Sequence, residues 1–142
     1  MLKLDQFINS SSANRFDLLN QSISHAKHAI RIERHQFGLT TLGKILFEEM
    51  KHSDARFLSA FREAFVYLDE AITLEGRMNR IAIHPYMTMF GGTNHYLKQG
   101  GKLSNKEEDR IKRHLDNAEK FFSYDSSLMI LGNEVRARIE GA

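Results

Sequence analysis

The sequence DARFLSAFREAFVYLDEAITL, residues 54–74, carries the clearest periodic pattern in the chain. Its apolar residues recur at intervals of three and four, which places their side chains on one face of an α-helix. The seam consists of Phe57, Phe61, Ala64, Leu68 and Ala71, with Leu58, Phe65 and Ile72 beside it. So wide an apolar face is typical of a helix in a bundle core. We therefore expect this segment to be the hub of an all-α fold.

The region before the hub predicts two more helices. Ser11 or Ser12 can cap a long first helix over 13–37, roughly 37 Å at about 1.5 Å per residue. Its apolar seam, interrupted by a charge at Glu33, is formed by Phe16, Leu19, Ile23, Ala26 and Ile30. A shorter helix follows, capped by Thr40 or Thr41 and ending near residue 52. The interrupted seam is compatible with packing on a partner, including a second copy of the chain.

The region after the hub contains a proline, two diglycines and two further helical patterns. Pro85 predicts that the hub helix stops near residue 84, because the residue before proline avoids the α conformation. Residues 85–104 then read as a Gly-rich loop with a short helix at 94–99. Ser104 followed by Glu107 is a capping-box signature for a helix continuing to about residue 122. A last amphipathic helix is predicted from about residue 128 to residue 139.

The 142 residues fit a single helical domain spanning 1–142, an irregular bundle of about four to six helices. The chain has no cysteine, which excludes disulfides, thiolate metal sites and cysteine nucleophiles. Its first residues do not resemble a signal peptide, and no apolar run approaches the roughly 20 residues of a membrane span. We therefore expect a cytoplasmic protein with no membrane contact.

No cofactor or metal site is predicted. Glu49 and His52 have the Glu-x-x-His spacing of helical di-iron sites, but such sites require a second Glu-x-x-His, which the chain lacks. Phosphate-binding loops, dinucleotide fingerprints and nucleophile elbows are absent as well. The sequence therefore favours a protein without enzymatic activity.

Positive charge is concentrated in the middle of the chain. Residues 76–115 carry eight Lys and Arg against three Asp and Glu, a net charge of +5. Basic side chains beside aromatic ones suit phosphate contacts and base stacking, so this region is a candidate nucleic-acid-binding surface. Its candidate residues are Arg77, Arg80, Lys98, Lys102, Lys106, Arg110 and Arg113.

A short motif in the same region suggests one enzymatic alternative. Arg77 is separated from His84 by six residues, and Tyr86 follows in a His-x-Tyr arrangement. This resembles the Arg-x4-6-His motif of HEPN ribonucleases. The resemblance implies that His84 would deprotonate a ribose hydroxyl while Arg77 stabilises the phosphate.

The leading hypothesis is a small non-enzymatic helical adaptor or regulator that acts through protein–protein contacts. It predicts that the long first helix or the Gly-rich segment is presented to a partner. The candidate partner-binding residues in that segment are Tyr86, Phe90 and Tyr96. The nucleic-acid-binding subunit and the HEPN-like ribonuclease are the alternatives.

Overall fold

A computed structural model describes residues 12–32, 36–77 and 82–141, and the side chains of 17–27, 38–74 and 82–141. Within these residues the regular elements are all helical, which confirms the all-α class and the irregular bundle. Their bounds are α2 (Ser12–Ile32), α3 (Gln36–His52), the 3-10 helix η1 (Asp54–Arg56), α4 (Phe57–Arg77), α5 (Ile83–Lys98), α6 (Asn105–Phe122) and α7 (Ser126–Glu140).

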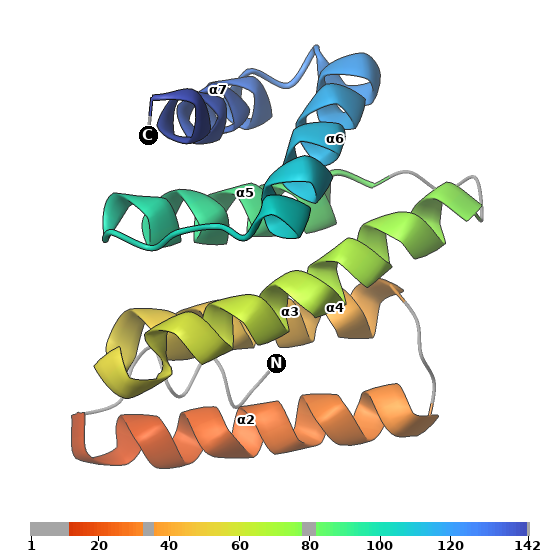
Figure 1. The fold of residues 1–142 in the computed structure, drawn as a ribbon. Helices are drawn as coiled ribbons and strands as arrows, with labels where there is room; N and C mark the ends of the chain where they lie inside the picture. Colours follow the sequence, from red (N-terminus) through yellow and green to blue (C-terminus); the bar gives the residue numbers. More distant parts are fainter. Residues whose placement is uncertain (1–11, 33–35, 78–81, 142) are drawn as a thin grey trace.

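The helices are stacked in layers (Figure 1). The α3–α4 pair forms the middle, with α2 packed on α3 at one edge and α5 on the other side. Helix α7 packs on α5 at the opposite edge, and α6 crosses α5 steeply before it turns into α7. The predicted hub therefore lies at the centre of the molecule as α4.

The α3–α4 pair is held close by a small residue facing a large one. A Cβ added at Gly43 would lie 2.6 Å from Cγ of Leu68, so only glycine permits this approach of the two helices. Phe61, Ala64 and Leu68 of the predicted seam are fully buried against α3 and α5. The periodicity of residues 54–74 thus identified the buried seam correctly, whereas Leu58, expected beside the seam, is 46% exposed.

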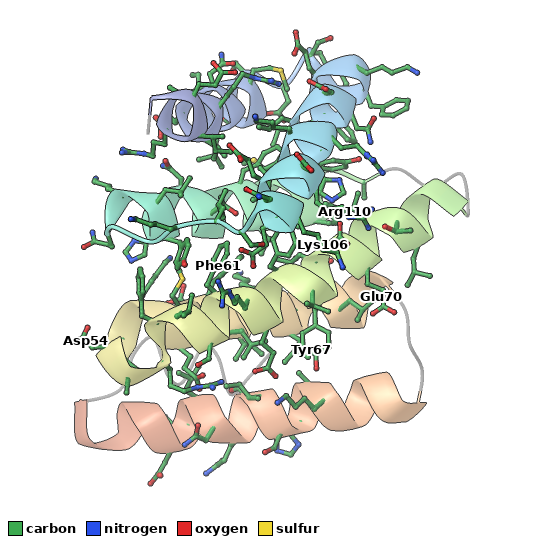
Figure 2. All side chains as sticks on the ribbon, in the orientation of Figure 1. Asp54, Phe61, Tyr67, Glu70, Lys106 and Arg110 are labelled. Atoms are coloured by element: carbon green, nitrogen blue, oxygen red, sulfur yellow. The ribbon has the colours of Figure 1, made fainter. Side chains whose placement is uncertain are left out.

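Aromatic stacking joins α4 to α5. The rings of Phe61 and Tyr96 are 3.8 Å apart between centroids and nearly parallel, and Phe57 stacks on the same tyrosine at 5.0 Å. Figure 2 shows Phe61 projecting from α4 toward α5. The Tyr96 hydroxyl donates a hydrogen bond to the carbonyl of Lys102, 2.9 Å away, so the ring also anchors the connection that follows α5.

The expected Gly-rich loop over 85–104 is wrong, because most of it is the continuous helix α5. Pro85 lies in the first turn, where a backbone N–H has no intrahelical partner and proline is tolerated. Gly92 is retained inside the helix because a Cβ there would overlap the ring of Phe47 on α3. The real connection is residues 99–104, in which Gly100 has a φ of +94°.

Several predicted boundaries also shift. The described first helix ends at Ile32, and residues 33–35, with the charge interruption at Glu33, lie outside the described part. Helix α3 begins at Gln36, before the expected Thr caps.

The capping box of Ser104 and Glu107 is confirmed. The backbone N–H of Ser104 donates to Glu107 Oε1 at 2.8 Å, and the backbone N–H of Glu107 donates to Ser104 Oγ at 3.2 Å.

No helix within residues 12–32, 36–77 and 82–141 combines the length and the apolar character that crossing a membrane requires.

Candidate functional site

An acid clamped between a guanidinium and an imidazole links α4 to α6. Arg110 Nε lies 3.2 Å from both carboxylate oxygens of Asp69, and a second guanidinium nitrogen donates to Oδ2 at 2.7 Å. His114 Nε2 lies 2.7 Å from Oδ1 of the same carboxylate. Arg110 and His114 are one turn apart on α6, so both side chains reach α4 together. Figure 2 shows Arg110 where α6 passes α4.

The electrostatics of this cluster stabilise the ionised acid. Burial acts to raise the pKa of Asp69, but the hydrogen bonds from His114 and Arg110 outweigh it and hold that pKa below its ordinary value. The hydrogen bond to Asp69 in turn raises the pKa of Arg110. Because a carboxylate only accepts hydrogen bonds, Nε2 of His114 donates in this contact.

His114 is enclosed by protein. Only 5% of its side chain is exposed, and the ring of Tyr86 meets it edge-on at 6.2 Å between centroids. Among the described atoms, its Nδ1 is buried without a hydrogen-bond partner. The Asp69–Arg110–His114 cluster therefore fastens α6 to α4.

A second polar network closes the other end of α4. Arg56 Nε donates to the buried Glu49 at 2.6 Å, and a further guanidinium nitrogen contacts Glu63 at 3.3 Å. Lys27 of α2 contacts the second oxygen of Glu63 at 2.8 Å. The hydrogen bond with Glu49 raises the pKa of Arg56. These ion pairs connect α2, α3, η1 and α4, so Glu49 acts as a structural acid here.

No group of three or more His, Asp or Glu that could hold a metal occurs among the described residues.

The described nucleic-acid candidates lie on α5, on the connection after it and on α6. Lys98 ends α5 and Lys102 lies in the connection that follows, whereas Lys106, Arg110 and Arg113 are on α6. Lys106 and Arg110 are visible in Figure 2 beside α4, and Arg110 is engaged by Asp69. The side chain of Arg77 and all of Arg80 lie outside the described part.

The ribonuclease candidates are not brought into one site by the described residues. His84 is exposed in the first turn of α5, and the side chain of Arg77 is not described. Tyr86, two residues later, is buried with its ring 5.7 Å from that of Phe122. The HEPN-like interpretation stays a prediction.

The expectation that the Gly-rich segment displays aromatic side chains is wrong. Tyr86, Phe90 and Tyr96 are all buried in the core. A helix turns its residues toward the core once per turn, and α5 lies between the α3–α4 pair and α7. These three side chains therefore pack the core and are not available to a partner.

Large apolar side chains are exposed instead around the turn between α6 and α7. The exposed fractions are 42% for Phe121, 79% for Tyr124 and 61% for Ile130. Sequence reasoning missed this α6–α7 corner, although one signal was present. That signal is the adjacent pair Phe121 and Phe122 at the end of the helix, although the spacing alone does not say that Phe121 is the exposed one, since it lies three residues after the buried Ala118.

A shallow depression of about 530 Å³ lies between the C-terminal ends of α3 and α5. Its lining includes Lys51, Phe57, His95 and Gln99. Burial lowers the pKa of His95, and the charges of Lys51 and Lys98 lower it further. With Asp54 also on the rim, the depression has mixed charge and selects no ligand class.

Comparison of the chain with protein-family models, curated proteins and solved structures finds no match.

Proposed function

We propose that this chain is a small non-enzymatic helical adaptor or regulator, and that the α6–α7 corner is its protein-binding surface. The observation that carries the proposal is the exposure of Phe121, Tyr124 and Ile130 within one short segment. Aromatic and large aliphatic side chains supply most of the binding energy at protein interfaces. Their exposure gains nothing for the isolated fold.

The polar clusters support the same assignment. Asp69 is bound by both Arg110 and His114 across α4 and α6, and Glu49 is neutralised by Arg56. Hydrogen-bonded ion pairs of this kind fix the relative positions of the helices that they join. Helix α6, which leads into the corner, is thus held on α4, and a surface that is already ordered loses less conformational entropy on binding.

The test is capture of a partner by variants that keep the fold. The triple variant Phe121→Ser, Tyr124→Ser and Ile130→Ser is expected to lose the proteins that the wild-type chain retains from a lysate of its own cells. The matched control, Leu58→Ser with Val66→Ser, changes exposed apolar residues of α4 and should retain them. Both variants should keep a melting temperature close to that of the wild type, because a substitution of an exposed residue usually changes the free energy of unfolding by about 0.5 kcal/mol or less. Equal capture by the triple variant and the wild type would refute the proposal.

A further inference from the structure

Three basic residues form a regular row along α6. Lys106, Arg113 and Lys120 follow one another at intervals of seven residues, and all three are exposed. Seven residues make nearly two turns, so the side chains lie on one line, about 10 Å apart. Among the described side chains, none of the three takes part in an ion pair. We call this set the α6 basic row.

The row leads directly to the exposed aromatic residues. Nζ of Lys120 lies 5.4 Å from the centre of the Phe121 ring, so the last charge and the first apolar side chain are adjacent. Tyr124 follows in the turn, its ring packed on Phe122 at 6.2 Å. A ligand lying along α6 would meet three cations and then an apolar surface.

The rest of the α6 charge is largely compensated within the molecule. Glu108 pairs with Lys112 at 3.6 Å, and Arg136 of α7 contacts Asp116 at 3.3 Å and Glu119 at 3.9 Å. On the side facing α4, Arg110 is bound by Asp69. Among the described side chains, the charges of α6 that have no ion pair are therefore those of the α6 basic row and that of Asp109.

We propose that the α6 basic row, together with Phe121 and Tyr124, binds an acidic α-helix of a partner protein. Carboxylates one heptad apart on that helix would face the row, and an apolar side chain would pack against the two rings. The seven-residue spacing of the row carries the proposal. Two α-helices packed side by side present residues to each other at this interval, so a partner helix with carboxylates seven residues apart would face all three cations. This inference rests on the proposed function and names the chemistry of its partner.

Two observations favour a protein helix over a nucleic acid. Binding to a polyanion grows with the number of phosphates neutralised, and three cations about 10 Å apart neutralise few. Asp109 and Asp116 lie four residues before Arg113 and Lys120, so carboxylates flank the row. A continuous phosphate backbone would be repelled there, whereas a helix can place neutral or basic residues opposite them.

The experiment uses the full chain and three labelled probes in fluorescence anisotropy. The first is a helical peptide of about three heptads with one Glu per heptad on a single face and a terminal Leu-Phe pair. The second has the same composition with its glutamates distributed around the helix, and the third is a single-stranded oligouridine. The first peptide should bind roughly tenfold more tightly than the second, the combined effect of three exposed charge pairs.

Charge reversal locates the binding. The variant Lys106→Glu, Arg113→Glu and Lys120→Glu should lose about tenfold in affinity for the first peptide. The control Lys44→Glu, Lys51→Glu and Lys98→Glu makes the same change in net charge on α3 and α5, away from the row, and should stay within about threefold of wild type. Equal binding of the two peptides, no binding of either, or an unaffected charge-reversed variant would each overturn the proposal. So would tighter binding of the oligouridine that the same variant abolishes.

These results are separable from the test of the proposed function. If the full chain does not bind the peptides while the substitutions at Phe121, Tyr124 and Ile130 still abolish partner capture, the adaptor function is supported and the acidic partner helix is rejected. If the corner substitutions leave capture intact, the proposed function fails whatever the peptides do.

Discussion

Nε2 of His114 lies 2.7 Å from Oδ1 of Asp69, a contact that joins α6 to α4 across 45 residues of sequence. Arg110 grips the same carboxylate from the preceding turn. Helix α6 makes its strongest polar connection to the central helix here. Because α6 also carries the basic row and leads into the α6–α7 corner, the position of both surfaces depends on this cluster.

Asp69→Asn should lower the free energy of unfolding by about 2 kcal/mol. The substitution removes the negative charge to which both Arg110 and His114 are hydrogen-bonded in a half-buried site. Urea unfolding followed by circular dichroism would measure the change. Asp116→Asn is the matched control, because Asp116 is 72% exposed and its contact with Arg136 is a surface pair, which contributes about 0.5 kcal/mol or less. Equal effects of the two substitutions would show that the cluster does not fasten the helices.

The contribution of Asp69 should depend on pH in one direction. Its pKa in the folded chain is below the ordinary value of 3.8, so its carboxylate stabilises the fold fully above that value. Stability is lost as pH falls through the lower, folded pKa. The difference in unfolding free energy between wild type and Asp69→Asn should therefore be constant near neutrality and shrink below pH 3.8. A difference that grows on acidification would contradict this sign.

Two adjacent glycines of α5 should respond in opposite ways to alanine. A methyl group added at Gly91 would meet only open space, so Gly91→Ala should stabilise the helix by about 0.5–1 kcal/mol. Gly92→Ala should cost roughly 1–3 kcal/mol, because the new methyl meets the buried ring of Phe47. Thermal unfolding of the two variants checks both signs, and Phe47→Leu should partly rescue Gly92→Ala. Stabilisation by both substitutions would mean that α5 does not pack this closely on α3.

The depression at the ends of α3 and α5 yields a prediction for His95. Its pKa should be below 6.5 in an NMR titration, and Lys51→Gln should raise it by removing a nearby positive charge. Lys44→Gln, two turns earlier on α3, should leave it unchanged. Since the unfolded pKa is the higher one, His95 reduces stability as pH falls through 6.5. A pKa above 6.5 in the wild type would contradict the assigned surroundings.

The helices could be predicted from the sequence wherever residues close together in the chain carry the signal, as an apolar spacing of three and four or a capping motif does. The seam of Phe61, Ala64 and Leu68 and the capping box at Ser104 are such patterns, and both are confirmed. Helix α5 could not be predicted in this way. Glycine is a helix breaker by local preference, and the reason for Gly92 is its contact with Phe47, far away in sequence.

The candidate site was less accessible to sequence reasoning. The partnership of Asp69 with Arg110 and His114 depends on how α6 crosses α4, which no local spacing encodes. The excess of Lys and Arg in residues 76–115 was visible in the sequence. Which of these side chains form ion pairs and which belong to the α6 basic row depends on the tertiary fold. The exposure of Phe121 could not be predicted from the spacing either, because two consecutive residues of a helix can both be buried, as Met89 and Phe90 are in α5.

Photo-crosslinking in the cells from which the chain derives tests the α6–α7 corner most directly. A benzophenone amino acid would replace Tyr124 in one variant and Leu58, an exposed apolar residue of α4, in another. We expect a discrete heavier adduct on irradiation of the position-124 variant and none at position 58. Identical patterns at the two positions, or no adduct at position 124, would contradict a protein-binding role for the corner.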